Sequence, residues 1–211
     1  MKYFIDTEFH EGFHKPLFGR RRHFIDLISI GIFAEDGREY YAISNDFDLK
    51  AAWNNLWLRE YVLRPIYVEH WAEGHTPNPF SRSSFQDFIM DMECISKPNE
   101  QIAQEIKAFV NHGVGKPEFY GYYADYDWVV FCSLFGRMID LPEGFPMYCR
   151  DLKQMLDEKA EHYSIDIPRS MILDMIKSRP DYPKNSNEHN ALADARWNYD
   201  LYQFILKFDE L

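Results

Sequence analysis

The sequence predicts one α/β domain, and three observations support this fold class. The chain has 211 residues, a length that suits a single hydrophobic core. Two strand-like segments near the start are followed by a hairpin signal, so the sheet should begin antiparallel. Helical and strand-like patterns then alternate to the last residues without a repeat, a low-complexity tract or a linker.

The first part of the chain should form three strands. Residues 2–8 and 25–34 are rich in Ile, Phe and Tyr, which favour a pleated, half-buried backbone. Asp36-Gly37 is typical of a tight β-hairpin turn and leads into a third strand over 38–44.

A helix and an irregular segment should come next. Apolar residues recur at helical spacing from Leu49 to Trp57, after two aspartates that suit an N-cap. Gly, Pro, Asn and Ser are frequent at 70–86, and we expect an irregular insertion over about 64–95.

The second half of the chain returns to regular patterns. Residues 102–110 have helical spacing after Pro98, and 118–123 read as a short strand. A helix is expected over 126–135, closed by Gly136.

The C-terminal part should be mainly helical. We expect a helix over 151–161, a loop over 168–183 with one helical turn or more, and a long final helix over 188–208 with an apolar stripe.

Composition restricts the class of protein. The 23 basic and 34 acidic residues give a net charge of −11, which argues against general coating of nucleic acid but not against a nuclease whose cleft holds cations. Cys94, Cys132 and Cys149 lack zinc-ligand spacing and indicate buried thiols. No membrane-length apolar stretch or signal peptide is present, so we expect a cytoplasmic protein without a membrane partner.

One motif near the start suggests a zinc peptidase. Residues His10 to His14 spell His-Glu-x-x-His, which needs a helix to place both imidazoles on one metal. Gly12 lies inside the motif, a strand precedes it and Pro16 follows it, so we reject the zinc interpretation.

An acidic pair overlaps the same region. Asp6 and Glu8 are two residues apart in a strand, so their side chains share one face about 7 Å apart and can lean toward common cations. Taken alone, such a pair is more often a solvated charge at a strand end.

Two aspartates lie between the strand at 118–123 and the next helix. Asp125 suits a helix cap, and Asp127 suits a place near the helix N-terminus, where the dipole favours a carboxylate. A structural role and a functional role can both hold here, one for each aspartate.

His189 should lie in the first turn of the last helix or just before it, and Asp194 lies within that helix. Five helical steps rotate by about 500°, so the two side chains would lie roughly 140° apart and cannot ligate one ion from a regular helix. Asp194 borders the apolar stripe, where an unpaired charge is costly, so it should face a cation or a partner. His189 suits a proton acceptor beside the same site.

These three segments, in this order, resemble the motifs of the DEDDh exonucleases, RNase H-like proteins that remove nucleotides from 3′ ends. Phe4 to Glu8 contains an Asp-x-Glu, Tyr126-Asp127 is followed one turn later by Phe131, and His189 to Ala195 matches His-x-Ala-x-x-Asp-Ala residue for residue. Within this family, the likeness is closest to mycobacterial-type exoribonucleases and RNase T-like proteins.

The resemblance implies an RNase H-like fold over 1–211, with a central mixed five-stranded sheet flanked by helices. It also implies two Mg²⁺ or Mn²⁺ ions, with His189 as the acceptor of a proton from the attacking water. The aromatic-Asp pair favours Asp127 as the second-motif ligand, with Asp125 as the alternative. The implied metal ligands are Asp6, Glu8, Asp127 and Asp194.

Substrate contacts are expected beside the motifs. Thr7, Phe9, Tyr123 and Trp128 flank them, and the aromatic members could stack on terminal bases. Arg20-Arg21-Arg22 is the densest basic run in an acidic chain, and it is either a phosphate-binding segment or a solvated loop.

The function implied by the resemblance is removal of nucleotides from the 3′ ends of single-stranded RNA or DNA, with RNA favoured. A nucleotide or dinucleotide phosphodiesterase of the same fold is an alternative, because the same two-metal chemistry would serve it. A catalytically inactive interaction module is another, although all four carboxylates and the histidine are retained. The resemblance is compatible with a homodimer.

Overall fold

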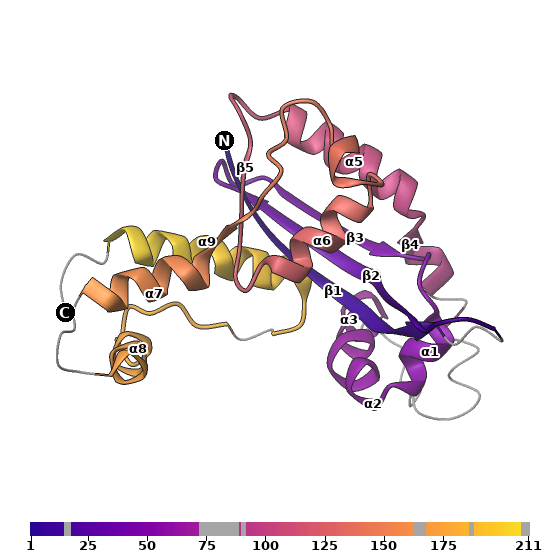
Figure 1. Cartoon of the computed structure of the whole chain (residues 1–211), viewed down its shortest axis with the longest axis horizontal. Coiled ribbons are helices and arrows are strands. Elements are labelled where there is room, and N and C mark those ends of the chain that lie inside the picture. Colours follow the sequence, from indigo (N-terminus) through magenta and orange to yellow (C-terminus); the bar gives the residue numbers. More distant parts are fainter. Residues whose placement is uncertain (15–17, 72–88, 90–91, 163–167, 186–187, 208–211) are drawn as a thin grey trace.

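The structure, a computed structural model, describes residues 1–14, 18–71, 89, 92–162, 168–185 and 188–207 (Figure 1). Within these ranges, a six-stranded mixed sheet has the order β4-β3-β2-β1-β5-β6. The α/β class is therefore confirmed. The sheet has six strands where five were expected, because β4 (Ser96–Lys97) and β6 (Arg150–Asp151) have two residues each, too few to produce a sequence pattern.

The sheet is built around a long hairpin. Strands β1 (Lys2–His14) and β2 (Arg22–Ala34) pair in antiparallel fashion, and β3 (Glu39–Ser44) extends the meander. Strand β5 (Glu118–Gly121) then adds to the other side of β1 in parallel. Both hairpin strands are longer than expected. Their outer halves pair with each other and with no further strand of the described sheet.

The His-Glu-x-x-His segment lies in this outer half. Residues His10 to His14 are part of β1 and pair with Arg22 to Asp26 of β2. Because a strand separates residues i and i+4 by about 13 Å, the two imidazoles cannot grip one zinc ion. The structure thus agrees with rejection of the zinc peptidase interpretation.

Helices cover the outer end of the sheet where an irregular insertion was expected. Helix α3 (Arg64–Trp71) continues α1 (Leu49–Asn54), α2 (Leu56–Leu58) and the π-helical segment η1 (Arg59–Leu63). Residues 92–95 are also helical, whereas 72–88 and 90–91 lie outside the described residues.

The expectation of irregular structure is therefore wrong for 64–71. Ile66 and Tyr67 of α3 are buried against Ile28 and Ile43 of the sheet. This packing stabilises a helix whose sequence signal is weak, because polar residues interrupt its short apolar pattern.

The remaining helices follow the expected order. Helix α8 (Arg169–Lys177) occupies part of the expected loop at 168–183. The short 3₁₀ helix η2 (Met138–Asp140) follows α6 (Asp125–Ser133). Their bounds are Asn99–Asn111 for α5, Asp125–Ser133 for α6, Leu152–His162 for α7, Arg169–Lys177 for α8 and Ala191–Lys207 for α9.

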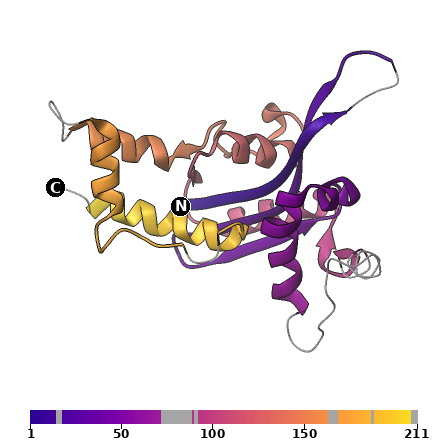
Figure 2. The same cartoon turned by 90° about the horizontal axis from the view of Figure 1, so that it is seen from below.

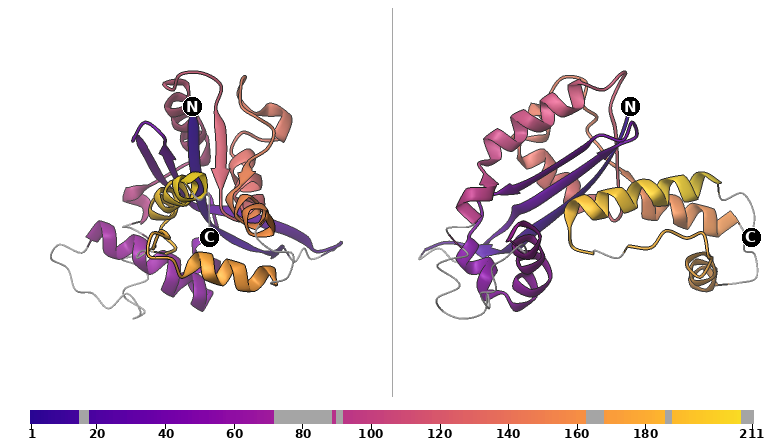
Figure 3. Two further views of the ribbon diagram at one scale, coloured as in Figure 1. Left: turned by 90° about the vertical axis from the view of Figure 1, so that its left-hand side faces the viewer. Right: turned by 180° about the vertical axis from the view of Figure 1, so that it is seen from behind.

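The alternation of β1 side chains creates a core on each face of the sheet. Tyr3 and Ile5 pack in a cluster with Ile106 of α5 and Phe131 of α6. Phe4 faces the opposite side and packs in a cluster with Leu201 of α9. Figure 3 shows α9 crossing the sheet, with α5 on the opposite face.

The hairpin of β1 and β2 extends beyond the rest of the molecule (Figure 2). Strand β3 pairs with β2 only from Ser29 to Phe33, so residues 9–14 and 22–27 form a two-stranded projection. We call residues 9–14 and 18–27 the β1–β2 arm. No helix in the described ranges has the length and apolar character needed to cross a membrane.

Candidate active site

Three carboxylates meet where α9 reaches the middle of β1. Asp6 and Glu8 project from the same face of β1, opposite Gly31 and Ser29 of β2. One oxygen from each of Asp6, Glu8 and Asp194 lies within 4.8 Å of the others. A β-bulge follows Glu8, a feature that often re-aims side chains beside functional sites.

Residues just before α9 (Ala191–Lys207) hold the Asp194 side chain in place. Its Oδ2 accepts a hydrogen bond of 2.9 Å from the backbone N–H of His189, and the Asn185 side chain donates to its Oδ1. Gly31 allows α9 to come close, since a Cβ there would lie 2.2 Å from the Ala191 carbonyl oxygen. Close packing of backbone on backbone therefore sets the position of Asp194.

Asp127, which lies on α6, is the fourth carboxylate of the acidic group. Its Oδ1 accepts hydrogen bonds from the Thr7 backbone N–H at 2.9 Å and from Thr7 Oγ1 at 2.6 Å. Asp127 is buried and lines the same cavity as Asp6, whereas Asp125 is exposed at the first position of α6. The geometry favours Asp127 as the candidate ligand. Thr7, which donates to Asp127, also lines the cavity, and its contact with substrate stays a prediction.

His189 stands over the cluster in an uncommon backbone conformation. Its φ is 66°, in the left-handed region that few non-glycine residues adopt. The ring Nδ1 lies 3.8 Å from Glu8 Oε1. The ring also meets Trp57 and Tyr61 edge-on, with centroid distances of 4.9 and 6.2 Å.

The four carboxylates and His189 line a cavity of about 510 Å³. Apart from His189, no basic side chain from the described residues lines it. Its acidic residues are Asp6, Glu8, Asp127, Glu188 and Asp194. Its aromatic residues are Phe9, Tyr122, Tyr123, Tyr126 and Trp197.

Burial raises the pKa of all four clustered carboxyls. The pKa of Glu8 rises to about 8, those of Asp127 and Asp194 to about 6, and that of Asp6 well above its usual range. Desolvation is the main cause, and repulsion by neighbouring carboxylates adds to it. Oxygen donors that are costly to ionise together fit a site for hard divalent cations, which would compensate their charge.

Two of the expected stacking residues lie in the cavity. Phe9 stacks on Tyr126 with ring centroids 5.9 Å apart, and Tyr123 is 64% exposed beside Tyr122. Tyr123 also has a positive φ of 55°. Both rings are placed where a terminal base could reach them.

Trp128 is not placed there, which corrects the expectation that it stacks on a base. It is 8% exposed and stacks on Phe131 with ring centroids 4.9 Å apart. Because Trp128 lies on the inner face of α6, its indole fills the core instead of facing the cavity.

The arginine run is exposed and does not line the cavity. Arg22 pairs with His14 near the end of the β1–β2 arm, and Arg20 and Arg21 precede it. Phosphate binding by these residues stays a prediction, but it would take place away from the carboxylates.

Several site residues were not predicted from the sequence. Asn198 donates a 2.9 Å hydrogen bond to the Ile5 carbonyl, and its place one helical turn after Asp194 is a signal that could have identified it. Tyr126 directly precedes Asp127, and this adjacency could have identified it. Asn185, Trp57 and Tyr61 come from segments without a motif, so only the fold reveals them.

The mixed sheet with α9 across it, and carboxylates gathered from β1, α6 and α9, define a protein of the RNase H-like exonuclease class. A family model for the 3′-5′ exoribonuclease Rv2179c-like domain matches residues 1–206, and the chain belongs to this family. It is 30% identical over 211 residues to the 3′-5′ exoribonuclease Rv2179c of Mycobacterium tuberculosis strain H37Rv. The 3′-5′ exoribonuclease MT2234.1 of strain CDC 1551 matches equally, and each comparison covers 100% of this chain and 96% of the relative.

Proposed function

We propose that this chain is a two-metal 3′-5′ exoribonuclease that acts on single-stranded 3′ ends. The observation that carries the proposal is the meeting of Asp6, Glu8, Asp127 and Asp194 in one cavity, with His189 beside them. Family membership supports the 3′-5′ exoribonuclease activity, and the cavity supplies the residues to which we assign it.

The four carboxylates would hold the two Mg²⁺ or Mn²⁺ ions. Asp6, Glu8 and Asp194 already have oxygens close enough to share an ion, and Asp127 borders them. When bound, the ions would lower the pKa of the attacking water and stabilise charge on the leaving 3′ oxygen.

His189 would accept the proton from the water that attacks the terminal phosphodiester. Its ring lies beside Glu8 but is not among the closely grouped ligand atoms of Asp6, Glu8 and Asp194. This position suits a general base better than a metal ligand. Its backbone N–H fixes Asp194, so one residue would orient a ligand and supply the proton acceptor.

The aromatic residues of the cavity would hold the terminal nucleotides. Phe9, Tyr123 and Tyr126 offer faces for base stacking, which is sequence-tolerant because every base has a π-face. A preference for RNA is supported by the names of the two relatives, which are exoribonucleases. A homodimer, with which the family resemblance is compatible, is a further proposal, and sedimentation analysis would test it.

The test is degradation of 5′-labelled single-stranded 20-mers of RNA and DNA with Mg²⁺, with Mn²⁺ or with EDTA. We expect a ladder that shortens from the 3′ end in either metal, runs faster on RNA and is absent in EDTA. A faster DNA ladder would contradict the RNA preference, and internal cleavage products would contradict the exonuclease assignment.

A dinucleotide phosphodiesterase is the second candidate, and one observation favours it. The cavity has no Lys or Arg among its described lining residues, so it offers little grip on the backbone of a long strand. Adding a dinucleotide to the same assay separates the candidates, because cleavage of the dinucleotide beside an intact 20-mer would favour this alternative.

A further inference from the structure

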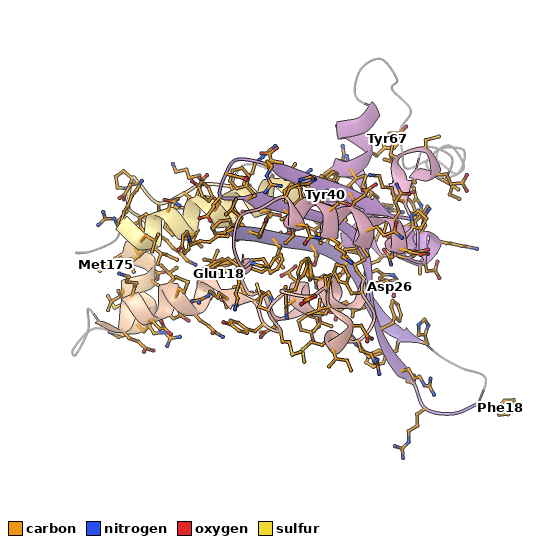
Figure 4. All side chains as sticks on the ribbon, turned by 90° about the horizontal axis from the view of Figure 1, so that it is seen from above. Phe18, Asp26, Tyr40, Tyr67, Glu118 and Met175 are labelled. Carbon is orange, nitrogen blue, oxygen red and sulfur yellow. The ribbon has the colours of Figure 1, made fainter. Side chains whose placement is uncertain are left out.

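The β1–β2 arm carries basic groups that the candidate active site lacks. Phe18 is 91% exposed and lies at the outer end of the arm, well beyond the packed part of the molecule (Figure 4). Arg20, Arg21 and Arg22 follow it and are all exposed. None of the three takes part in an ion pair within the described residues.

The charge of this run contrasts with the rest of the chain. The net charge is −11 and the cavity is acidic, so a polyanion finds its densest positive segment on the arm. Arginine binds phosphate in a bidentate manner, and three in succession suit a repeating phosphate backbone better than a single anion.

The arm places these arginines at a defined distance from the carboxylates. Six residue steps along β1 separate Glu8 from His14, the partner of Arg22, which is about 20 Å at roughly 3.3 Å per residue. A stacked nucleic-acid strand rises about 3.4 Å per nucleotide, so the same span corresponds to about six nucleotides.

From these observations we propose that the β1–β2 arm binds the phosphate backbone of the substrate strand several nucleotides upstream of the scissile bond. The arginines of the arm then add affinity to strands longer than about six nucleotides and none to shorter ones. This inference rests on the proposed function, because it assumes that the 3′ end lies at the carboxylates.

The test compares the triple variant Arg20→Gln, Arg21→Gln and Arg22→Gln with the wild-type chain on a trinucleotide and a 20-mer of RNA. We expect KM for the 20-mer to rise about tenfold, while KM for the trinucleotide changes less than twofold. Each phosphate contact contributes about 0.7 to the slope of log affinity against log salt, so the slope for the 20-mer should fall by about 2.

A matched control removes the same charge elsewhere on the surface. Lys107, Lys116 and Lys177 are exposed and lie outside the arm, and their replacement by Gln should leave the length dependence intact. Equal losses in the two triple variants, equal KM changes for both substrates, or no change for either would overturn the proposal.

Fluorescence anisotropy keeps this test separate from that of the nuclease activity. Binding of the labelled 20-mer by the wild-type chain and by both triple variants needs no turnover. A chain that binds the 20-mer through the arm but degrades nothing would contradict the proposed function, whereas phosphate binding by the arm would stand.

Discussion

Asp127 shows how one side chain ties two distant sequence motifs together. Its Oδ1 accepts two hydrogen bonds from Thr7, and Thr7 lies between Asp6 and Glu8 on β1. These hydrogen bonds favour the ionised carboxylate and oppose the rise in the pKa of Asp127 caused by burial. The Thr7 hydrogen bonds therefore fix the position of Asp127 relative to Asp6 and Glu8.

His189 is the residue whose replacement should separate chemistry from metal binding. Asn tolerates the left-handed backbone, so His189→Asn should keep the backbone N–H bond to Asp194 while removing the imidazole. We expect kcat to fall by about 10² to 10⁴. Titration calorimetry with Mn²⁺ should show affinity within a few-fold of wild type, and a parallel collapse of metal binding would contradict the role as base.

At the residue scale, the sequence identified the acidic cluster better than it identified the substrate contacts. The grouping of Asp6, Glu8 and Asp194 was implied by the resemblance of their motifs to those of the exonuclease family, so it could be predicted without coordinates. Trp128 shows why adjacency is not enough, because it follows Asp127 directly but lies on the inner face of α6. Which face a helix buries depends on packing that the local pattern did not reveal, since α6 is apolar around most of its surface.

Among the elements, the contact of α9 with β2 is the most sensitive to a small change. A methyl group at Gly31 would overlap the backbone of Ala191 and Leu192, which cannot move aside as a side-chain tip can. Gly31→Ala should therefore destabilise the fold by about 1 to 3 kcal/mol and displace Asp194. Thermal unfolding and activity should both fall.

Gly12→Ala is the matched control in the same hairpin. Its added methyl group would meet only the outer atoms of the Phe24 ring, which can turn away. We expect a small change in melting temperature and unchanged activity on a trinucleotide, which does not reach the arginines of the arm. Similar losses in the two variants would show that α9 is not held by close backbone contact.

The segment formed by α2 and η1 supplies the outer contact of His189. Trp57 and Tyr61 are about half exposed, and their rings lie 5.6 Å apart beside the imidazole. The π-helical turn of η1, a feature frequent at functional sites, carries Tyr61. This segment thus orients a residue of the last motif although it has no motif of its own.

Removal of the Trp57 ring should loosen His189 without removing a ligand. We expect Trp57→Ala to lower kcat about tenfold with little change in KM, and Trp57→Phe to retain most of the activity, since a misoriented base is a small geometric loss. Leu56→Ala is the control, because Leu56 is exposed on the same helix. A loss of equal size in the Leu56 variant would point to a general effect on α2.

The elements themselves were predictable where their patterns are long. Strands β1 and β2 were expected from their Ile, Phe and Tyr content, and the hairpin of β2 and β3 from Asp36-Gly37. Helices α5 and α9 were expected from apolar periodicity, and the structure confirms all of these elements. Strands β4 and β6 were missed because two residues carry no period, and α3 was missed because burial against Ile28 and Ile43 outweighs its composition. The parallel addition of β5 beside β1 depends on long-range pairing, which local patterns do not specify.

Taken as a whole, the molecule concentrates unfavourable charge in one cavity. Groups whose pKa is raised in the folded state bind more protons than in the unfolded chain, so ionising them costs stability as pH rises. For Glu8, Asp127 and Asp194, this loss begins near the ordinary carboxyl pKa of about 4. It is complete above a pH of about 8, the pKa that Glu8 reaches.

The metal-free chain should therefore become less stable between pH 5 and pH 8. We expect the melting temperature in EDTA to fall over this range and the fall to shrink in saturating Mg²⁺, which binds the ionised carboxylates of the folded state. Glu8→Gln should reduce the fall in EDTA. A melting temperature that rises with pH in EDTA would contradict the assignment of a buried carboxylate cluster.

The most direct test of the central claim is single-turnover degradation of a 5′-labelled RNA 20-mer by the wild-type chain and by Asp6→Asn, in Mg²⁺. We expect a 3′-shortening ladder for the wild type and a rate at least about 10³-fold lower for Asp6→Asn, since charge stabilisation by bound metal ions is worth several kcal/mol. Circular dichroism should show that the variant is folded. A folded Asp6→Asn that degrades RNA at the wild-type rate would place the active site elsewhere.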